Sequence, residues 1–266
     1  MPRTLKLTIA YDGSAYSGWQ RQENGPGIQA AIEDEIAPIV GRHTPIVAAG
    51  RTDAGVHAAG QVVSITIDHP VSCDDLLRAL NARLTRDIRI RSVEEAVDGF
   101  DARRDAKTKT YRYAVWNGSA PSPFIRHLVW HVPHPLDLGR MAAAAQLLIG
   151  EHDFAAFQGG GSDVKTTTRR LLAFDVRAVN LDADEFAALP AVGLDTTRAG
   201  SGLIRFEVIG GGFLRHMVRN IVGTLVDIGR NRTTVEEMTA ILESKDRASA
   251  GPTAPAQGLM LWEVKY

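Results

Sequence analysis

The hydrophobic and polar positions near the N-terminus alternate first with the period of a strand and then with that of a helix. Residues 5–11 place apolar side chains at every second position, which predicts a strand. Apolar residues recur three or four positions apart between residues 28 and 39, and Gly41 then predicts the end of a helix. The next segments predict strands at 46–49 and 62–67, a helix at 74–84 and a strand at 88–93. The first half therefore has the predicted order β-α-β-β-α-β.

The order of predicted elements recurs in the second half of the chain. The pattern there predicts a strand at 111–116, a helix at 138–149, strands at 171–179 and 203–209, helices at 213–229 and 235–243, and a strand at 259–264. Thr233, with Glu236 three residues later, is typical of a capping box before the last helix. No repeat of individual residues accompanies this order, so the duplication is one of elements only.

These two orders predict an α+β fold made of two pseudo-symmetric, ferredoxin-like halves, residues 1–105 and 106–266. A β-α-β-β-α-β unit forms an antiparallel sheet with two helices on one face. Two such sheets side by side would offer a long open surface with a central RNA-binding cleft. Similar sheets bind single-stranded RNA in other proteins, but a fold alone does not determine function.

The composition is that of a globular protein that folds without disulfides or a structural metal. The chain has 266 residues, of which 44% are hydrophobic, enough for a substantial core. Cys73 is the single cysteine, which excludes an internal disulfide framework, and no Cys/His cluster has the spacing of a zinc site. No signal peptide or membrane-spanning run is present in the sequence. We therefore expect a soluble, cytoplasmic protein without a membrane partner.

Charge is balanced overall but uneven along the chain. The net charge of −1 gives no indication of a nucleic-acid partner. Between Arg103 and Arg112, however, five cations accompany one acid, and further basic residues cluster at 165–170, 215–219 and 230–232. Two interpretations remain open at this point, a solvated basic surface or contacts with RNA phosphates.

Residues 50–58, with the sequence GRTDAGVHA, are the segment most indicative of chemistry. Gly50 and Gly55 would allow sharp turns or positive φ angles, and a tight loop on a sheet is a common place for a functional carboxylate. Asp53 would then be presented from this loop. By its pattern alone, Asp53 is equally well explained as a turn residue that binds its own backbone.

The sequence GRTDAGVH resembles the signature of the tRNA pseudouridine synthase A family, and the resemblance covers nearly the whole chain. Its other motifs are YDG at 11–13, Tyr16, GWQ at 18–20, FDAR at 100–103, YRY at 111–113, GEHDF at 150–154, FLRHMVRN at 213–220, AP at 254–255 and GL at 258–259. Many motifs in one order are far more specific than one short pattern. The resemblance implies that Asp53 is the catalytic nucleophile.

The resemblance also implies the reaction and its substrate. Uridine becomes pseudouridine when the N1–C1′ bond breaks and C5 of the released uracil joins C1′. A carboxylate can attack either C1′ or C6 and later be expelled, and the choice between them stays open. The resemblance implies that the targets are uridines 38, 39 and 40 in the anticodon stem-loop of tRNA, that no cofactor is needed, and that the protein is a homodimer.

Four further residues receive roles in this interpretation. Burial in a partly dry cleft disfavours a charged carboxylate, and the resemblance assigns Arg219 to pair with Asp53 and orient it. Arg215, four positions earlier on the predicted helix, would share its face, and either arginine could instead contact phosphate or solvent. Tyr111 would stack on the target base and take part in proton removal from C5, and Tyr113, on the same face of its strand, would share or support the pocket.

Arg51 would insert into the RNA base stack at the place that the extruded uridine leaves and hold the stack open. Its alternative role is contact with a phosphate. We expect a structural role for His57, and a flexible surface loop at the triglycine 159–161, since no Lys-Ser/Thr pair follows it. Residues 180–202, which include Asp182, predict an acidic hairpin without a family motif.

Two other functional classes compete with this interpretation. One is an RNA-binding module that has lost activity, although such a protein would not need Asp53, Tyr111 and Arg219 together. The other is a hydrolytic glycosidase, which ordinarily needs two carboxylates where only Asp53 has a motif.

Overall fold

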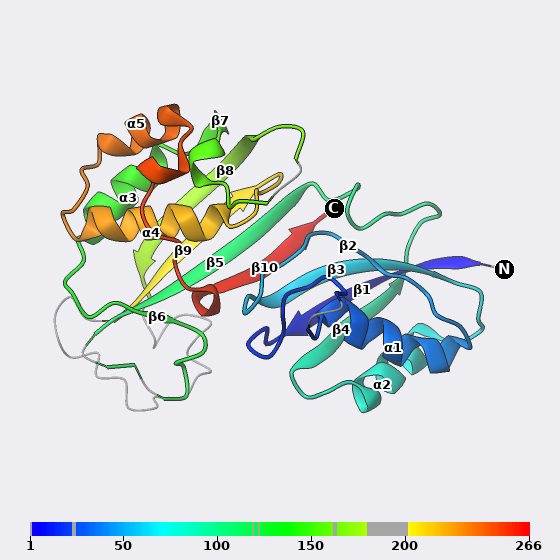
Figure 1. Cartoon of the computed structure of the whole chain (residues 1–266). Coiled ribbons are helices and arrows are strands. Elements are labelled where there is room, and N and C mark those ends of the chain that lie inside the picture. Colours follow the sequence, from blue (N-terminus) through cyan, green and yellow to red (C-terminus); the bar gives the residue numbers. More distant parts are fainter. Residues whose placement is uncertain (1, 23–24, 119, 122, 162–163, 180–201) are drawn as a thin grey trace. The chain divides into compact units, whose positions relative to one another are not determined.

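The computed structural model describes residues 2–22, 25–118, 120–121, 123–161, 164–179 and 202–266, and it has an α+β architecture (Figure 1). The chain divides into two compact units, one made of residues 1–109 and 260–266 and the other of residues 110–259. The predicted division at residue 105 assigned the last strand to the second half, whereas the structure groups residues 260–266 with the first unit.

The first unit contains the predicted β-α-β-β-α-β order and one added strand. Its elements are β1 (Arg3–Tyr11), α1 (Ile28–Val40), β2 (Val47–Ala48), β3 (His57–Ile67), α2 (Cys73–Arg83), β4 (Ile88–Glu95) and most of β10 (Leu259–Lys265). The strand order is β4-β1-β3-β10, with β2 paired to β3. Neighbours of β1 are antiparallel to it, but β10 runs parallel to β3. The predicted strands and helices of this half are confirmed, and β3 begins five residues earlier than predicted.

The core of the first unit follows from the periodicity of its elements. On β1 the alternate residues Leu5, Leu7 and Ile9 are fully buried, and Ile32 of α1 and Leu80 of α2 are buried in the same way. Gly41 ends α1 with a φ of 79°, a left-handed conformation that glycine adopts without a Cβ clash. Ser72 caps α2 by accepting a hydrogen bond from the Asp75 amide. The apolar stripes therefore cover one side of the sheet with α1 and α2.

The second unit also combines strands with helices packed against them. Its elements are most of β5 (Thr108–Asn117), β6 (Trp130–His131), α3 (Leu138–Gln146), β7 (Gly150–Asp153), β8 (Thr168–Ala178), β9 (Gly202–Gly210), α4 (Met217–Gly229) and α5 (Glu237–Ser244). The strand order is β5-β9-β8-β7, with β6 beside β5. Strands β6 and β7 are too short to show a period, which is why the pattern did not predict them. Helix α4 is buried along most of its length.

Two predicted boundaries in the second unit are wrong. The helix predicted from residue 213 begins at Met217, because His216 has a φ of 59° and so interrupts helical geometry. The capping box lies one residue later than predicted, since Thr234 and Glu237 exchange their side-chain and backbone hydrogen bonds at 2.6 and 3.2 Å. The predicted acidic hairpin at 180–202, including Asp182, lies almost entirely outside the described residues.

Within the part of the chain that the structure describes, no helix is long and apolar enough to cross a membrane.

Candidate active site

Asp53 lies half-buried in the loop between β2 and β3, in the first unit. The Val56 amide donates to the Asp53 carbonyl at 3.1 Å and closes a four-residue turn. Gly55 has a φ of 76° at the third position of this turn, where a positive φ favours glycine. The turn therefore fixes the backbone that carries the Asp53 carboxylate.

The segment that follows β1 holds this loop from behind. The Tyr11 hydroxyl and Thr52 Oγ1 lie 2.8 Å apart, and the Trp19 amide donates to the Thr52 carbonyl at 3.0 Å. Burial raises the pKa of Tyr11, so its hydroxyl remains a neutral hydrogen-bonding group. Gly18 has a φ of 106°, and a Cβ there would lie 2.8 Å from the Thr52 carbonyl oxygen. The motif residues Tyr11, Gly18 and Trp19 thus position the residue that precedes Asp53.

His57 has contacts that fit its expected structural role. Its side chain is 1% exposed, and its Nδ1 lies 3.2 Å from the donating amide of Gly13 and 3.1 Å from Asp12 Oδ1. A Cβ on Gly13 would collide with the Val56 carbonyl oxygen. This packing joins the first residue of β3, which directly follows the turn of Asp53, to the segment after β1.

Gly50 and Arg51 begin the same loop. The Gln61 side-chain amide donates to the Gly50 carbonyl at 2.8 Å. The predicted positive φ occurs at Gly55 but not at Gly50, where a Cβ would instead lie 3.4 Å from Cε of Lys109. Arg51 is exposed, and its side chain has no hydrogen bond or ion pair with any described residue. Its guanidinium is therefore accessible to a partner such as RNA.

Tyr111 lies on β5 in the second unit and is 8% exposed. Its ring meets that of Phe213 edge to face, with centroids 5.0 Å apart and an interplanar angle of 77°. Phe213 lies in the segment before α4, so this contact connects β5 to the segment that carries Arg215. The packing fixes the orientation of the Tyr111 ring.

Arg219 lies in the first turn of α4 and is half-buried. Its Nε donates to the Ala254 carbonyl at 2.7 Å, and the Ala254 amide donates to the Arg219 carbonyl at 3.1 Å. This reciprocal pair joins α4 to the loop before β10. A guanidinium has five donors in a rigid fork, so fixing Nε also sets the direction of the remaining donors.

Tyr113 is fully buried two residues after Tyr111. Its hydroxyl donates to the Pro255 carbonyl at 2.8 Å, and a Cβ on Gly258 would lie 2.5 Å from its ring. Burial raises the pKa of Tyr113, while the nearby charge of Arg219 acts in the opposite direction. Of the two open roles for Tyr113, these contacts favour support of the pocket over contact with a base.

Arg215 lies in the turn before α4, not on the helix as predicted. Its Nη1 donates to the carbonyls of Gly160 and Gly161 at 2.8 and 3.3 Å, and the Gly159 amide donates to the Arg215 carbonyl at 2.8 Å. A Cβ on Gly159 would lie 2.5 Å from the His216 ring. The described part of the triglycine loop is therefore held against this turn, and glycine leaves room for His216.

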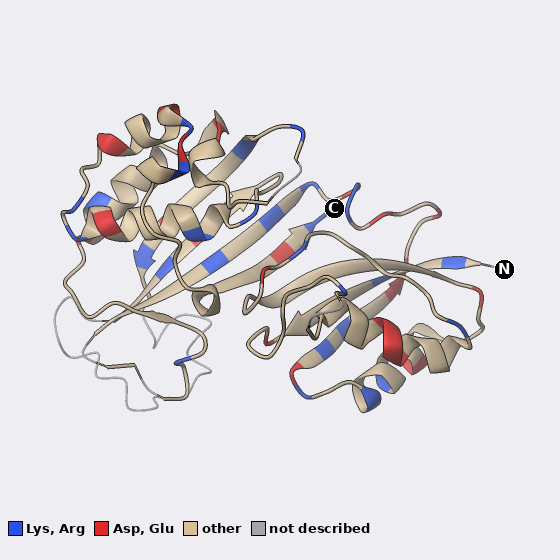
Figure 2. Cartoon of the chain, in the orientation of Figure 1, with Lys and Arg blue, Asp and Glu red and all other residues tan. Residues whose placement is uncertain are grey.

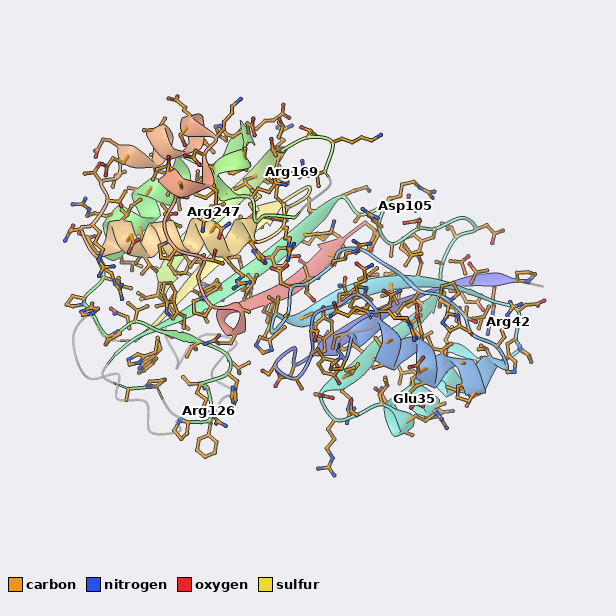
Figure 3. All side chains as sticks on the ribbon, viewed as in Figure 1. Glu35, Arg42, Asp105, Arg126, Arg169 and Arg247 are labelled. Carbon is orange, nitrogen blue, oxygen red and sulfur yellow. The ribbon has the colours of Figure 1, made fainter. Side chains whose placement is uncertain are left out.

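Asn220 is a residue for which the sequence predicted no role. It is completely buried, its Nδ2 donates to the Phe157 carbonyl at 2.8 Å, and its Oδ1 accepts from Thr253 at 2.6 Å and Arg247 at 3.2 Å. Arg247 is labelled beside α4 in Figure 3. Asn220 thus fixes the start of α4 and the loop that holds Arg219. The only signal in the sequence was a polar residue within an apolar helical pattern.

The structure places the predicted residues in two groups. Arg51 and Asp53 share one loop of the first unit, and Tyr111, Tyr113, Arg215 and Arg219 belong to the second. The meeting of the two groups around one uridine remains a prediction. No group of three or more His, Cys, Asp or Glu side chains that could hold a metal ion occurs among the described residues.

Comparisons with known proteins match this chain over almost its full length. A family model described as tRNA pseudouridine synthase matches residues 7–103 and 144–266. Three curated relatives share the name tRNA pseudouridine synthase A. The protein of Geotalea uraniireducens is 42% identical over 99% of this chain and 100% of its own. The protein of Moorella thermoacetica is 42% identical over 98% of this chain and 99% of its own. The protein of Acetivibrio thermocellus is 40% identical over 99% of this chain and 100% of its own.

Proposed function

Because the chain belongs to the tRNA pseudouridine synthase family, we propose that it isomerises uridines of tRNA to pseudouridine with Asp53 as the nucleophile. The protein is an isomerase of the tRNA pseudouridine synthase A type. The observation that supports the nucleophile is the turn of Asp53, which is fixed at Thr52 by Tyr11 and Trp19 and at Val56 by its own backbone. A carboxylate carried by a fixed backbone loses less conformational entropy when it attacks than one on a mobile loop.

The proposed reaction conserves every atom of the nucleotide. Asp53 attacks C1′ or C6 and forms a covalent intermediate, and the N1–C1′ bond breaks. The uracil then turns, C5 bonds to C1′, the Asp53 carboxylate is expelled, C5 loses its proton and N1 gains one. The sequence of steps is redox-neutral, so we propose that it needs no cofactor.

Arg219 is proposed to keep Asp53 ionised and aimed. A positive charge next to a carboxylate favours the charged form, which is the nucleophilic one. The bond from Arg219 Nε to the Ala254 carbonyl supports this role because it restricts the guanidinium to a narrow range of orientations. Asn220 and Thr253 support the loop around Ala254 from the other side.

Two arginines are proposed to contact the substrate apart from the reacting atoms, and Tyr113 is proposed to support the pocket. Arg51 would fill the space that the extruded uridine leaves, in keeping with its exposed side chain. Arg215 would contact the RNA backbone with the donors that the triglycine loop does not use. Tyr113 would form the floor under Tyr111, in keeping with its burial.

Replacing Tyr111 with phenylalanine separates the two roles proposed for this residue. If the hydroxyl takes part in proton removal from C5, we expect kcat to fall by about 10²-fold or more, while the affinity for tRNA changes little. Replacing it with leucine would also remove the stacking surface, which contributes about 1–3 kcal/mol per base. Single-turnover kinetics with labelled tRNA measure both effects. A phenylalanine variant with wild-type kcat would leave Tyr111 with stacking alone.

We propose the anticodon stem-loop as the target, at uridines 38, 39 and 40. Tritium release from tRNA labelled at C5 of uridine tests the activity, because C5 loses its hydrogen only when the new bond forms. Mapping of pseudouridine in the product tests the positions. If the wild-type protein releases no tritium from any tRNA, the proposed function is wrong.

A tRNA substrate is consistent with a cytoplasmic location, which we propose as well.

We also propose that the protein is a homodimer, as the resemblance to the family implies, with an elongated tRNA lying across both subunits. Size-exclusion chromatography with light scattering is expected to give twice the mass of 28.8 kDa at micromolar protein concentration. A monomer alone under these conditions would contradict the proposal.

A further inference from the structure

Lys109 lies against the loop that carries Asp53, although it is distant from it in sequence. It is the second residue of β5 and is half-buried. A Cβ at position 50 would lie 3.4 Å from Lys109 Cε and 3.8 Å from Cδ, so the aliphatic stem of the lysine passes over Gly50. Gly50 does not have a positive φ, so its backbone conformation does not require glycine. The stem of Lys109 therefore packs against the Asp53 loop at Gly50.

The two acids of the turn before β5, Asp101 and Asp105, are bonded within that turn and not to Lys109. Asp105, labelled in Figure 3, accepts from Arg104 Nε at 3.1 Å and from the Asp101 amide at 2.8 Å. Asp101 Oδ1 accepts from the amides of Arg103 and Arg104 at 2.8 and 2.9 Å. Arg104 also donates to the Gly99 carbonyl. The turn therefore neutralises Arg104 and uses its two carboxylates for its own geometry.

Two cations of the basic run, Arg103 and Lys109, are left without an anionic partner in the described part of the chain. Neither the guanidinium of Arg103 nor the ammonium of Lys109 has a hydrogen bond or an ion pair with a described residue. Burial depresses the pKa of Lys109, and the positive charge of Arg103 depresses it further. Two like charges, one of them partly desolvated, oppose folding unless an anion joins them.

Lys107 provides a comparison within the same basic run. It is exposed, and its side chain also has no partner among the described residues. Its ammonium stays in contact with water, so the folded protein carries no desolvation penalty at Lys107 that a bound anion would relieve. Figure 2 shows the basic positions of β5 in blue. Lys109 differs from Lys107 in its burial and in its position over Gly50.

We propose that Arg103 and Lys109 form a binding site for a phosphodiester group of the RNA backbone, beside the loop that carries Asp53. The proposal rests on the proposed function, since it identifies where the substrate of that site is held. A phosphate at this position would be anchored close to the nucleophile loop, and the backbone of the target nucleotide would be fixed while its base turns.

The chemistry of the two side chains favours phosphate over a base edge. A lysine ammonium is a compact point charge with donors only, and a guanidinium presents a fork that matches phosphate oxygens. Neither group accepts a hydrogen bond, so the pair cannot recognise both donors and acceptors of a base. Contacts of this kind position the nucleic acid and carry no sequence information.

The test replaces Lys109 with methionine, which keeps an unbranched stem over Gly50 and removes the charge. We expect the Kd for an unmodified tRNA transcript to rise about five- to tenfold and the slope of log Kd against log salt to decrease by about 0.7 to 0.9. Arg103→Met should weaken binding in the same way. Fluorescence anisotropy with full-length protein carrying Asp53→Asn measures Kd without turnover.

Lys107→Met is the matched control, since it removes an identical charge two residues away. We expect its Kd to change by less than about twofold. The melting temperature of RNA-free Lys109→Met should equal or exceed that of wild type, because a desolvated charge is lost; a structural lysine would give a decrease. An unchanged Kd and salt slope for Lys109→Met, or equal effects of the two lysines, would overturn the proposal.

The failure of this site and the failure of the proposed function give different results. Tritium release by wild type reports the activity, whereas Kd and its salt slope report the phosphate contact whether or not turnover occurs. Loss of affinity in Lys109→Met with an inactive wild type would retain the site and refute the isomerase. An active wild type with unaltered binding in Lys109→Met would retain the isomerase and refute the phosphate site.

Discussion

Replacing Asp53 with asparagine is expected to abolish tritium release from tRNA labelled at C5 of uridine, lowering kcat by at least about 10³-fold. Asparagine has nearly the shape of aspartate, but its neutral amide is a poor nucleophile and a poor leaving group. The effect should therefore appear in the chemical step and not in affinity. Single-turnover measurements with saturating enzyme isolate this step.

The loop around Asp53 should survive the substitution. The bonds at Thr52 and Val56 involve Tyr11, Trp19 and backbone atoms, none of which changes. We expect Asp53→Asn to bind unmodified tRNA within about threefold of wild type.

Asp74→Asn is the matched control, because Asp74 is exposed in the first turn of α2 and loses the same charge. It should keep wild-type kcat, with a stability loss of at most about 1 kcal/mol from the helix dipole. If Asp53→Asn releases tritium as fast as wild type, Asp53 is not the nucleophile.

Replacing Arg219 with methionine is expected to lower kcat by about 10²- to 10³-fold, with a smaller effect on Kd. In the proposed mechanism, loss of the guanidinium removes both the charge that keeps Asp53 ionised and the group that orients it. Arg219→Lys should recover only part of the rate, because an ammonium cannot hold the Ala254 carbonyl through Nε and present a rigid fork at the same time.

Two measurements separate this role from a structural one. Both Arg219 variants lose the bond to Ala254 in its present geometry, so a decrease in melting temperature of similar size is expected for both. A purely structural arginine would give the two variants similar kcat values, whereas the proposed role predicts a much slower methionine variant. Arg232→Met, which removes an exposed ion pair with Asp227 after the same helix, should leave kcat unchanged. Wild-type kcat in Arg219→Met would remove Arg219 from the mechanism.

The elements of the first unit were predictable because their signals are local. Alternation at residues 5–11 and the stripe from residue 28 to Gly41 depend on burial of one face, and the structure confirms both within two residues. The two-residue strand β2 was also predicted, within a slightly longer run. The parallel addition of β10 to β3 could not be predicted, since nothing in either strand encodes a partner about 200 residues away.

The sequence predicted that Asp53 lies in a glycine-containing loop, but it did not predict the backbone conformation and contacts of that loop. The sequence showed two glycines around Asp53, and the resemblance supplied a role for the carboxylate. Only the structure showed that Gly55 has the positive φ, whereas Gly50 lies against the stem of Lys109. Both glycines satisfy the same pattern, and their different environments come from segments distant in sequence.

Local chemistry by itself determined the class of this protein: its periodicity gave the strands and helices, and its motifs gave the family and Asp53. Tertiary structure decided the rest, because packing between distant segments sets side-chain contacts. Helix α4 starts at Met217 and not at residue 213, and the turn before it is bonded to the backbone of Gly159. Tyr113 is buried because Gly258 admits its ring and the Pro255 carbonyl accepts a hydrogen bond from its hydroxyl. Neither effect has a counterpart in the pattern of neighbouring residues.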